Sequence, residues 1–268
     1  GSGGVVLSRS IATDKYRGSE LTSMMAIIAA VNGVATVAAP IAGGLIAGLG
    51  GWRGIFWSLM LLSMLLLLCT LRMNECMVVR LESSSSLGFR KVLRNRSYLR
   101  YVLTYMFSMG VLFTNIASAP FIMQTHYGLT TIQFSIVFGV NAMTFGIASM
   151  LIPMFPGRDA AIRAGTAGLL VFSMAIMAAF LLHAGFWIYE AMVFMLILMV
   201  GIVTTTANVA AMDSGRDNAG VASALLGAIG CAFGGIVPAI IAAGDMFIMT
   251  GSMFILCSAL TSICAFRR

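Results

Sequence analysis

The chain of 268 residues is 60% apolar and only 9% charged, and it carries a formal net charge of +7. A soluble domain is roughly 45–50% apolar and about 25% charged, so this composition excludes a soluble globular protein. It also excludes a disordered chain, because so much apolar surface is not stable in water. The sequence therefore predicts an integral membrane protein.

Long apolar stretches with few or no charged residues, separated by short polar segments, predict membrane-crossing helices. A bilayer core about 30 Å thick requires about 20 helical residues. Eight stretches meet this requirement in chain order: residues 21–49, 55–71, 101–123, 132–155, 164–182, 186–212, 220–244 and 246–266. Their continuous apolar character indicates helices rather than the alternating strands of a barrel. Residues 1–12, which include Arg9, are typical of half of a further span.

The basic residues predict the orientation of these spans. All 16 Lys and Arg residues except Arg53 fall on one set of span ends, which uses every alternate loop. The positive-inside rule places that side in the cytoplasm, together with the C-terminus and residues 72–100. The dispersed positive charge is thus a topology signal, and we expect no nucleic-acid partner.

Residues 72–100 form the longest polar stretch, with seven basic residues and a run of four serines at 83–86. We interpret this stretch as a cytoplasmic basic connector. It separates residues 1–71, the remainder of an N-terminal bundle, from residues 101–268, a C-terminal bundle of six spans.

A similar pattern of Pro and Gly in two spans indicates that the protein contains two related halves. Pro40 precedes Gly43 and Gly44 in the first span, and Gly234, Gly235 and Pro238 occur in the seventh. Two parallel-related halves of a secondary transporter would produce such a repeat.

Several motifs resemble one family. Residues 39–44 (Ala-Pro-Ile-Ala-Gly-Gly) and 51–57 (Gly-Trp-Arg-Gly-Ile-Phe-Trp) resemble the antiporter motif and following outer turn of the major facilitator superfamily, in particular its Bcr/CflA-type drug-resistance transporters. Arg9 with Asp14 resembles the charged inner end of the fourth helix in that family. Residues 118–121 resemble the outer end of the seventh helix, and Asn208 with residues 219–227 resembles the tenth and eleventh.

The resemblance implies an all-α, major-facilitator-type bundle. The eight spans then correspond to helices 5 to 12, and Gly1 lies inside helix 4. We therefore expect an N-terminally truncated chain that lacks helices 1 to 3, where relatives often carry the acidic residue that exchanges protons. Ala35 and Ala39 stand where the family usually has Gly. Within the motif, Pro40, Gly43 and Gly44 are expected to let the helix bend and pack tightly as a gate.

Membrane-embedded amides are the candidates for a substrate cavity, because an amide in hydrocarbon must find a polar partner. The candidates are Asn32, Asn115, Asn141 and Asn208. They either bind substrate or hold helices together, and both interpretations remain open here. Tyr105 and Phe113 would provide aromatic walls of the cavity or face lipid.

The coupling acid is not identified, since no Asp or Glu lies at the middle of a span. Glu190, a few residues inside the outer end of the sixth span, is the nearest candidate, and an interfacial position is its alternative.

The sequence contains no catalytic triad, metal-ligand cluster or nucleotide-binding glycine loop, so it predicts a transporter without a cofactor rather than an enzyme. The resemblance implies proton-coupled efflux of drugs or other small amphipathic compounds across the bacterial cytoplasmic (inner) membrane by a monomer. Two alternatives remain: a facilitator that imports or exchanges a nutrient or metabolite, and a membrane remnant that does not transport.

Overall fold

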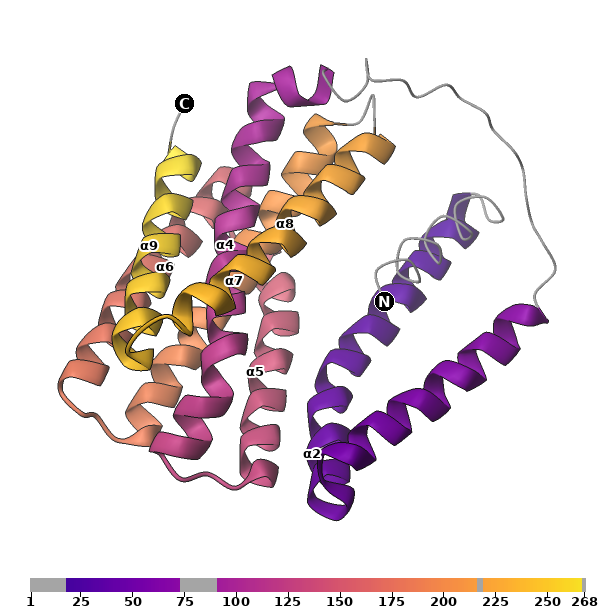
Figure 1. Cartoon of the computed structure of the whole chain (residues 1–268). Coiled ribbons are helices and arrows are strands. Elements are labelled where there is room, and N and C mark those ends of the chain that lie inside the picture. Colours follow the sequence, from indigo (N-terminus) through magenta and orange to yellow (C-terminus); the bar gives the residue numbers. More distant parts are fainter. Residues whose placement is uncertain (1–17, 73–90, 216–218, 267–268) are drawn as a thin grey trace. The chain divides into compact units, whose positions relative to one another are not determined.

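The computed structural model describes residues 18–72, 91–215 and 219–266 (Figure 1). Within these ranges the chain is helical and has no strand. Seven of the described helices are long and apolar enough to cross a membrane. The expected all-α membrane architecture is therefore confirmed. Arg9, Asp14 and the serine run at 83–86 lie outside the described residues.

The first described helix, α2 (Gly18–Leu71), contains two of the expected spans. Gly51 interrupts it with φ 59° and ψ −163°, a left-handed backbone conformation that glycine adopts without steric cost. The spans expected at 21–49 and 55–71 flank this break. The count of seven includes residues Ala38–Leu71 of α2 as one span, whereas the sequence analysis counted the two arms of α2 separately.

The remaining helices correspond to the other expected spans. They are α4 (Arg96–Phe121), α5 (Thr131–Leu151), α6 (Arg158–Leu181), α7 (Phe186–Ser214), α8 (Ala219–Ile241) and α9 (Met246–Phe266). A short π-helix, Ile122–His126, continues α4, and a 3-10 turn, Ile152–Met154, continues α5.

Helix α4 begins five residues before the span that the sequence predicts. The reason is a cap: the side-chain oxygen of Asn95 accepts hydrogen bonds from the backbone N–H groups of Ser97 and Tyr98 at 3.1 and 3.2 Å. Helical hydrogen bonding thus extends past the apolar layer, and the first turn of α4 carries Arg96 and Arg100. The last residues of the expected connector at 72–100 therefore belong to a helix.

Backbone contacts divide the chain into two compact units. The first unit contains α2 and residues 130–143, and the second contains α4, residues 144–151 of α5, and α6 to α9. In the second unit, α4 packs against α7, α8 and α9, and α6 packs against α7 and α9. Helix α4 therefore supplies the central surface of this unit.

Hydroxyl groups on the buried face of α4 are satisfied within the helix. Thr104, Ser108, Thr114 and Ser118 each donate to the carbonyl four residues earlier, at 2.8–2.9 Å. This bonding removes the cost of burying an unpaired hydroxyl in the helix bundle.

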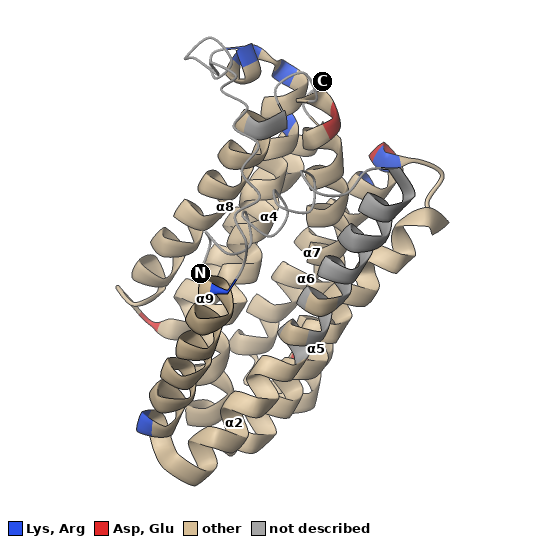
Figure 2. Ribbon diagram, turned by 90° about the vertical axis from the view of Figure 1, so that its right-hand side faces the viewer, with Lys and Arg blue, Asp and Glu red and all other residues tan. Residues whose placement is uncertain are grey.

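Lys and Arg side chains of the second unit gather at one end. Figure 2 shows Lys and Arg at the end where the C-terminus lies. Two ion pairs join helices there: Arg100 Nη2 lies 3.4 Å from Asp159 Oδ1, and Arg158 Nη1 lies 3.0 Å from Asp213 Oδ2. We refer to this as the basic end of the second unit.

Candidate functional site

Tyr105 and Phe113 lie against glycines of α8. A Cβ atom placed on Gly230 would stand 3.1 Å from Cε1 of Tyr105, and one placed on Gly234 would stand 2.7 Å from the ring of Phe113. The two half-buried rings thus occupy space that larger α8 side chains would fill. Both aromatic candidates line the contact between α4 and α8.

Asn115 lies on α4 and is 2% exposed. Its Oδ1 atom has no hydrogen-bond partner within the part of the chain that the structure describes. An unpaired buried acceptor costs about 1–3 kcal/mol, so this oxygen favours any ligand or water that brings a donor to it. Asn115 is therefore a candidate for ligand binding.

The other amides differ in their surroundings. Asn208 is half-buried on α7, which packs against α4, so Asn115 and Asn208 belong to neighbouring helices of the second unit. Asn141 is also buried, on α5 in the first unit. Its Oδ1 atom likewise has no hydrogen-bond partner in the described part of the chain, although the residue makes another interaction. Asn32 lies in α2, but its side chain is outside the described part of the structure.

The expected gating motif lies in α2. Pro40 is inside the helix and half-buried. A Cβ atom on Gly44 would overlap the side chain of Ser135 on α5, whereas one on Gly43 would meet nothing within 4 Å. The close approach of α2 and α5 therefore requires glycine at position 44, whereas position 43 has space for a side chain.

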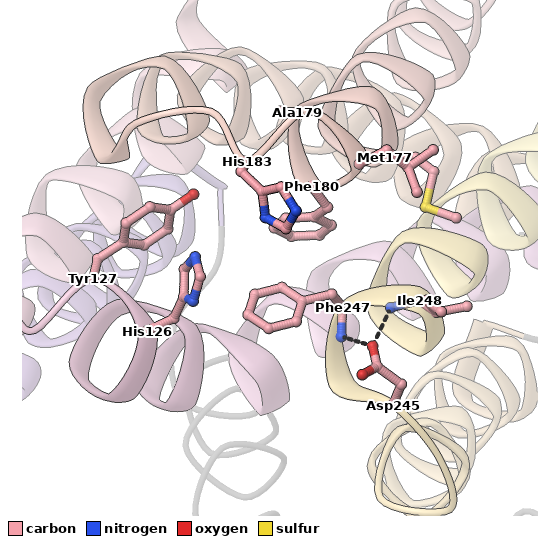
Figure 3. Close-up of a pocket in the computed structure, with 10 residues that line it drawn as sticks. His126, Tyr127, Met177, Ala179, Phe180, His183, Asp245, Phe247 and Ile248 are labelled. Atoms are coloured by element: carbon pink, nitrogen blue, oxygen red, sulfur yellow. Dashed lines mark hydrogen bonds between the residues drawn. The ribbon is translucent and has the colours of Figure 1, made fainter.

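The end of the second unit opposite the basic end contains a cavity of about 260 Å³ (Figure 3). His126, Tyr127, Phe180 and Phe247 contribute rings to its lining, and the His126 and Phe247 ring centres are 4.7 Å apart. The carboxylate of Asp245 accepts hydrogen bonds from the backbone N–H groups of Phe247 and Ile248, both at 3.0 Å, and so caps α9.

The aromatic residues of this cavity come from three separate helix ends, so no local sequence motif predicts that they form one site. The hydroxyl of Tyr127 donates to the Ala184 carbonyl at 3.1 Å, and burial raises the pKa of this tyrosine above its usual value. Glu190 is half-buried and follows Tyr189, whose ring stacks on that of Tyr127 at 5.6 Å.

A described structure made of membrane-length helices is that of a multi-pass membrane protein. The family model of the Major Facilitator Superfamily matches residues 1–239, and the chain belongs to this family. Its family is one of secondary transporters, not of enzymes. The superfamily expected from the motifs is thereby confirmed.

Two relatives are similar over nearly the whole chain. The chain is 29% identical over 276 residues to the uncharacterised MFS-type transporter YdgK of Bacillus subtilis, with 99% of the chain and 69% of the relative covered. It is 26% identical over 256 residues to the bicyclomycin resistance protein homolog of Haemophilus influenzae, with 92% of the chain and 64% of the relative covered. The chain thus spans about two thirds of the length of each relative.

Proposed function

We propose that this chain belongs to a secondary transporter that exports small amphipathic compounds across the bacterial cytoplasmic membrane, in exchange for protons. Membership of the Major Facilitator Superfamily supports secondary transport. Similarity to a bicyclomycin resistance protein homolog supports efflux of drug-like compounds and the Bcr/CflA-type branch. The observation that carries the proposal for substrate binding is the buried, unpartnered Oδ1 of Asn115.

Neutral hydrogen bonding is the chemistry that this site offers. The Asn115 oxygen accepts a hydrogen bond from a substrate hydroxyl or amide, and Asn208 on the adjacent α7 supplies a second amide. Tyr105 and Phe113 hold α4 against the Gly230 and Gly234 positions of α8. A site with neutral amides selects substrates by the position of their polar groups rather than by net charge.

The proposed organisation places residues 1–71 in the N-terminal bundle and residues 101–268 in the C-terminal bundle. Residues 72–100 and the basic end face the cytoplasm, and the aromatic cavity faces outward. We assign no coupling acid, and Glu190 remains a candidate.

Orientation can be tested with single cysteines, after the five native cysteines have been replaced by serine. Because basic loops remain in the cytoplasm, Ser84→Cys is expected to react with a membrane-impermeant thiol reagent only after cells are broken. The matched variant Ala243→Cys, in the turn before α9, is expected to react in intact cells. The reverse labelling pattern would contradict the proposed orientation.

Substrate recognition is tested by Asn115→Ala and Asn208→Ala in transport assays with a panel of amphipathic compounds. We expect each change to reorder the substrates, with about a five-fold loss for compounds that use the amide, since one hydrogen bond contributes about 1 kcal/mol. Because Asn115 Oδ1 has no partner in the described structure, its removal is expected to leave membrane abundance unchanged.

Asn141→Ala is the matched control, because Asn141 is equally buried but lies in the first unit, whereas Asn115 and Asn208 lie in the second. We expect this variant to lower protein abundance and to retain the ranking of substrates. If Asn115→Ala and Asn208→Ala instead reduce all substrates in proportion to lost protein, the amides hold helices together and the binding proposal fails.

A further inference from the structure

Two adjoining cavities lie at the basic end of the second unit. The larger has a volume of about 490 Å³ and is lined by Arg96, Leu99, Arg100 and Leu103 of α4 and by Ile263 of α9, among others. The smaller, of about 240 Å³, adds Asp159 and Arg163 of α6 and Phe266 of α9. Arg100 lines both cavities and joins them.

The lining of the larger cavity changes from charged to apolar along α4. Arg96 and Arg100 lie in the first turns of the helix, and Leu103 lies three residues beyond Arg100. At about 1.5 Å per residue, Leu103 lies about 4–5 Å further along α4 than Arg100, away from the basic end. Leu99 and Ile263 extend the apolar wall and are exposed by 37% and 59%. The cavity therefore has a cationic mouth and an apolar wall that extends along α4 away from the basic end.

The positive charge at this mouth is only partly balanced. Asp159 is the acidic residue that lines the smaller cavity, and its side chain is 61% exposed while it pairs with Arg100 at 3.4 Å. An exposed ion pair of this length contributes little. The Nε atom of Arg100 is buried and has no hydrogen-bond partner in the described part of the chain. The Nη2 group of Arg100 also donates to the Tyr101 hydroxyl at 3.3 Å. Arg96 and Arg163 add positive charge, so three arginines line the two cavities against one acidic residue.

We propose that these cavities bind the headgroup of an anionic phospholipid from the membrane leaflet at the basic end. Its phosphate oxygens accept hydrogen bonds from Arg96 and Arg100, and its acyl chain lies along Leu99, Leu103 and Ile263. Basic pockets between transmembrane helices are suited to such headgroups. An anion without an acyl chain would match only the cationic mouth and would leave the apolar wall uncovered.

The site is separate from the proposed substrate site. Its residues lie where α4 meets α9, whereas Tyr105 and Phe113 lie where α4 meets α8. The proposal rests on the membrane location of the helices and does not depend on which compound is transported.

Native mass spectrometry of the full-length protein, extracted with phosphatidylglycerol or phosphatidylcholine, tests the proposal. The protein is expected to retain phosphatidylglycerol preferentially. The double variant Arg96→Gln/Arg100→Gln is expected to bind it about 25-fold more weakly, because each basic contact with an anionic membrane is worth about five-fold. Inorganic phosphate at millimolar concentration is expected not to displace the lipid.

Two further variants separate lipid binding from misfolding and from general charge. Arg158→Gln removes an arginine of the same end that pairs with Asp213 at 3.0 Å and lines neither cavity, and it is expected to retain the lipid like the unmodified protein. Arg96→Lys/Arg100→Lys keeps the charge and is expected to restore most of the binding. Equal retention of both lipids, displacement by phosphate alone, or equal loss in Arg158→Gln would overturn the proposal.

Discussion

Replacement of Gly201 by Ala is expected to destabilise the second unit by about 1–3 kcal/mol, the usual cost of overpacking a helix contact. The new Cβ atom would stand 2.5 Å from Cβ of Ala148 and 2.9 Å from the backbone oxygen of Phe145. Neither atom can rotate away, so α5 and α7 must separate. Small residues allow membrane helices to approach closely, and the dispersion contacts around Gly201 would be lost with that separation.

The effect is measured as the temperature at which detergent-solubilised protein loses its monodisperse size-exclusion peak. Gly146→Ala is the matched control, because a Cβ atom there meets nothing within 4 Å. Both changes replace glycine by alanine inside a helix, so the gain in intrinsic helix propensity is the same and cancels in the comparison. An equal midpoint for the two variants would show that the close contact at Gly201 does not limit stability.

The second large effect is expected from Gly44→Val in the proposed gating motif. Its Cβ atom would be 2.6 Å from Cβ of Ser135, and the hydroxyl of Ser135 is held by a hydrogen bond to the Thr131 carbonyl at 2.8 Å. Escape from the overlap would require backbone movement in addition to breaking that bond. We expect transport to fall by about tenfold or more, which corresponds to about 1.4 kcal/mol in the rate-limiting step.

Gly43→Val is the matched comparison, since a Cβ atom on Gly43 would meet no other atom within 4 Å. Uptake or efflux of a fluorescent substrate by vesicles, normalised to protein abundance, would separate the two variants. We expect Gly43→Val to retain most of its activity. Similar losses in both would indicate that the motif acts through the flexibility of α2 and not through its packing on Ser135.

The described helices could be predicted because apolar length is a local property. The break in α2 at Gly51 falls between two expected spans, since a glycine pair and the adjacent Trp52 and Arg53 interrupt the apolar sequence. The start of α4 was misplaced because the Asn95 cap extends the helix through residues that were expected to lie in the connector. Capping and membrane burial are separate physical effects, and hydropathy reports only the second.

The candidate site was less accessible from sequence. Its amides could be named, because an amide in hydrocarbon is unusual. The contact between the ring of Phe113 and Gly234 could not be predicted, because these residues are far apart in the chain. The same limit applies to the aromatic cavity, whose rings meet only after α4, α6 and α9 have packed. Such contacts depend on helix register, which composition does not determine.

The hydroxyl bonding on α4 has a mechanical consequence. At its basic end, α4 is fastened to α8 by the Tyr98 hydroxyl, which donates to the Ala222 carbonyl at 2.7 Å. Further along, Thr104, Ser108, Thr114 and Ser118 bond only to their own helix in the interactions described above. Along these four residues, α4 therefore meets its neighbours mainly through close packing, and dispersion contacts hold it in place there.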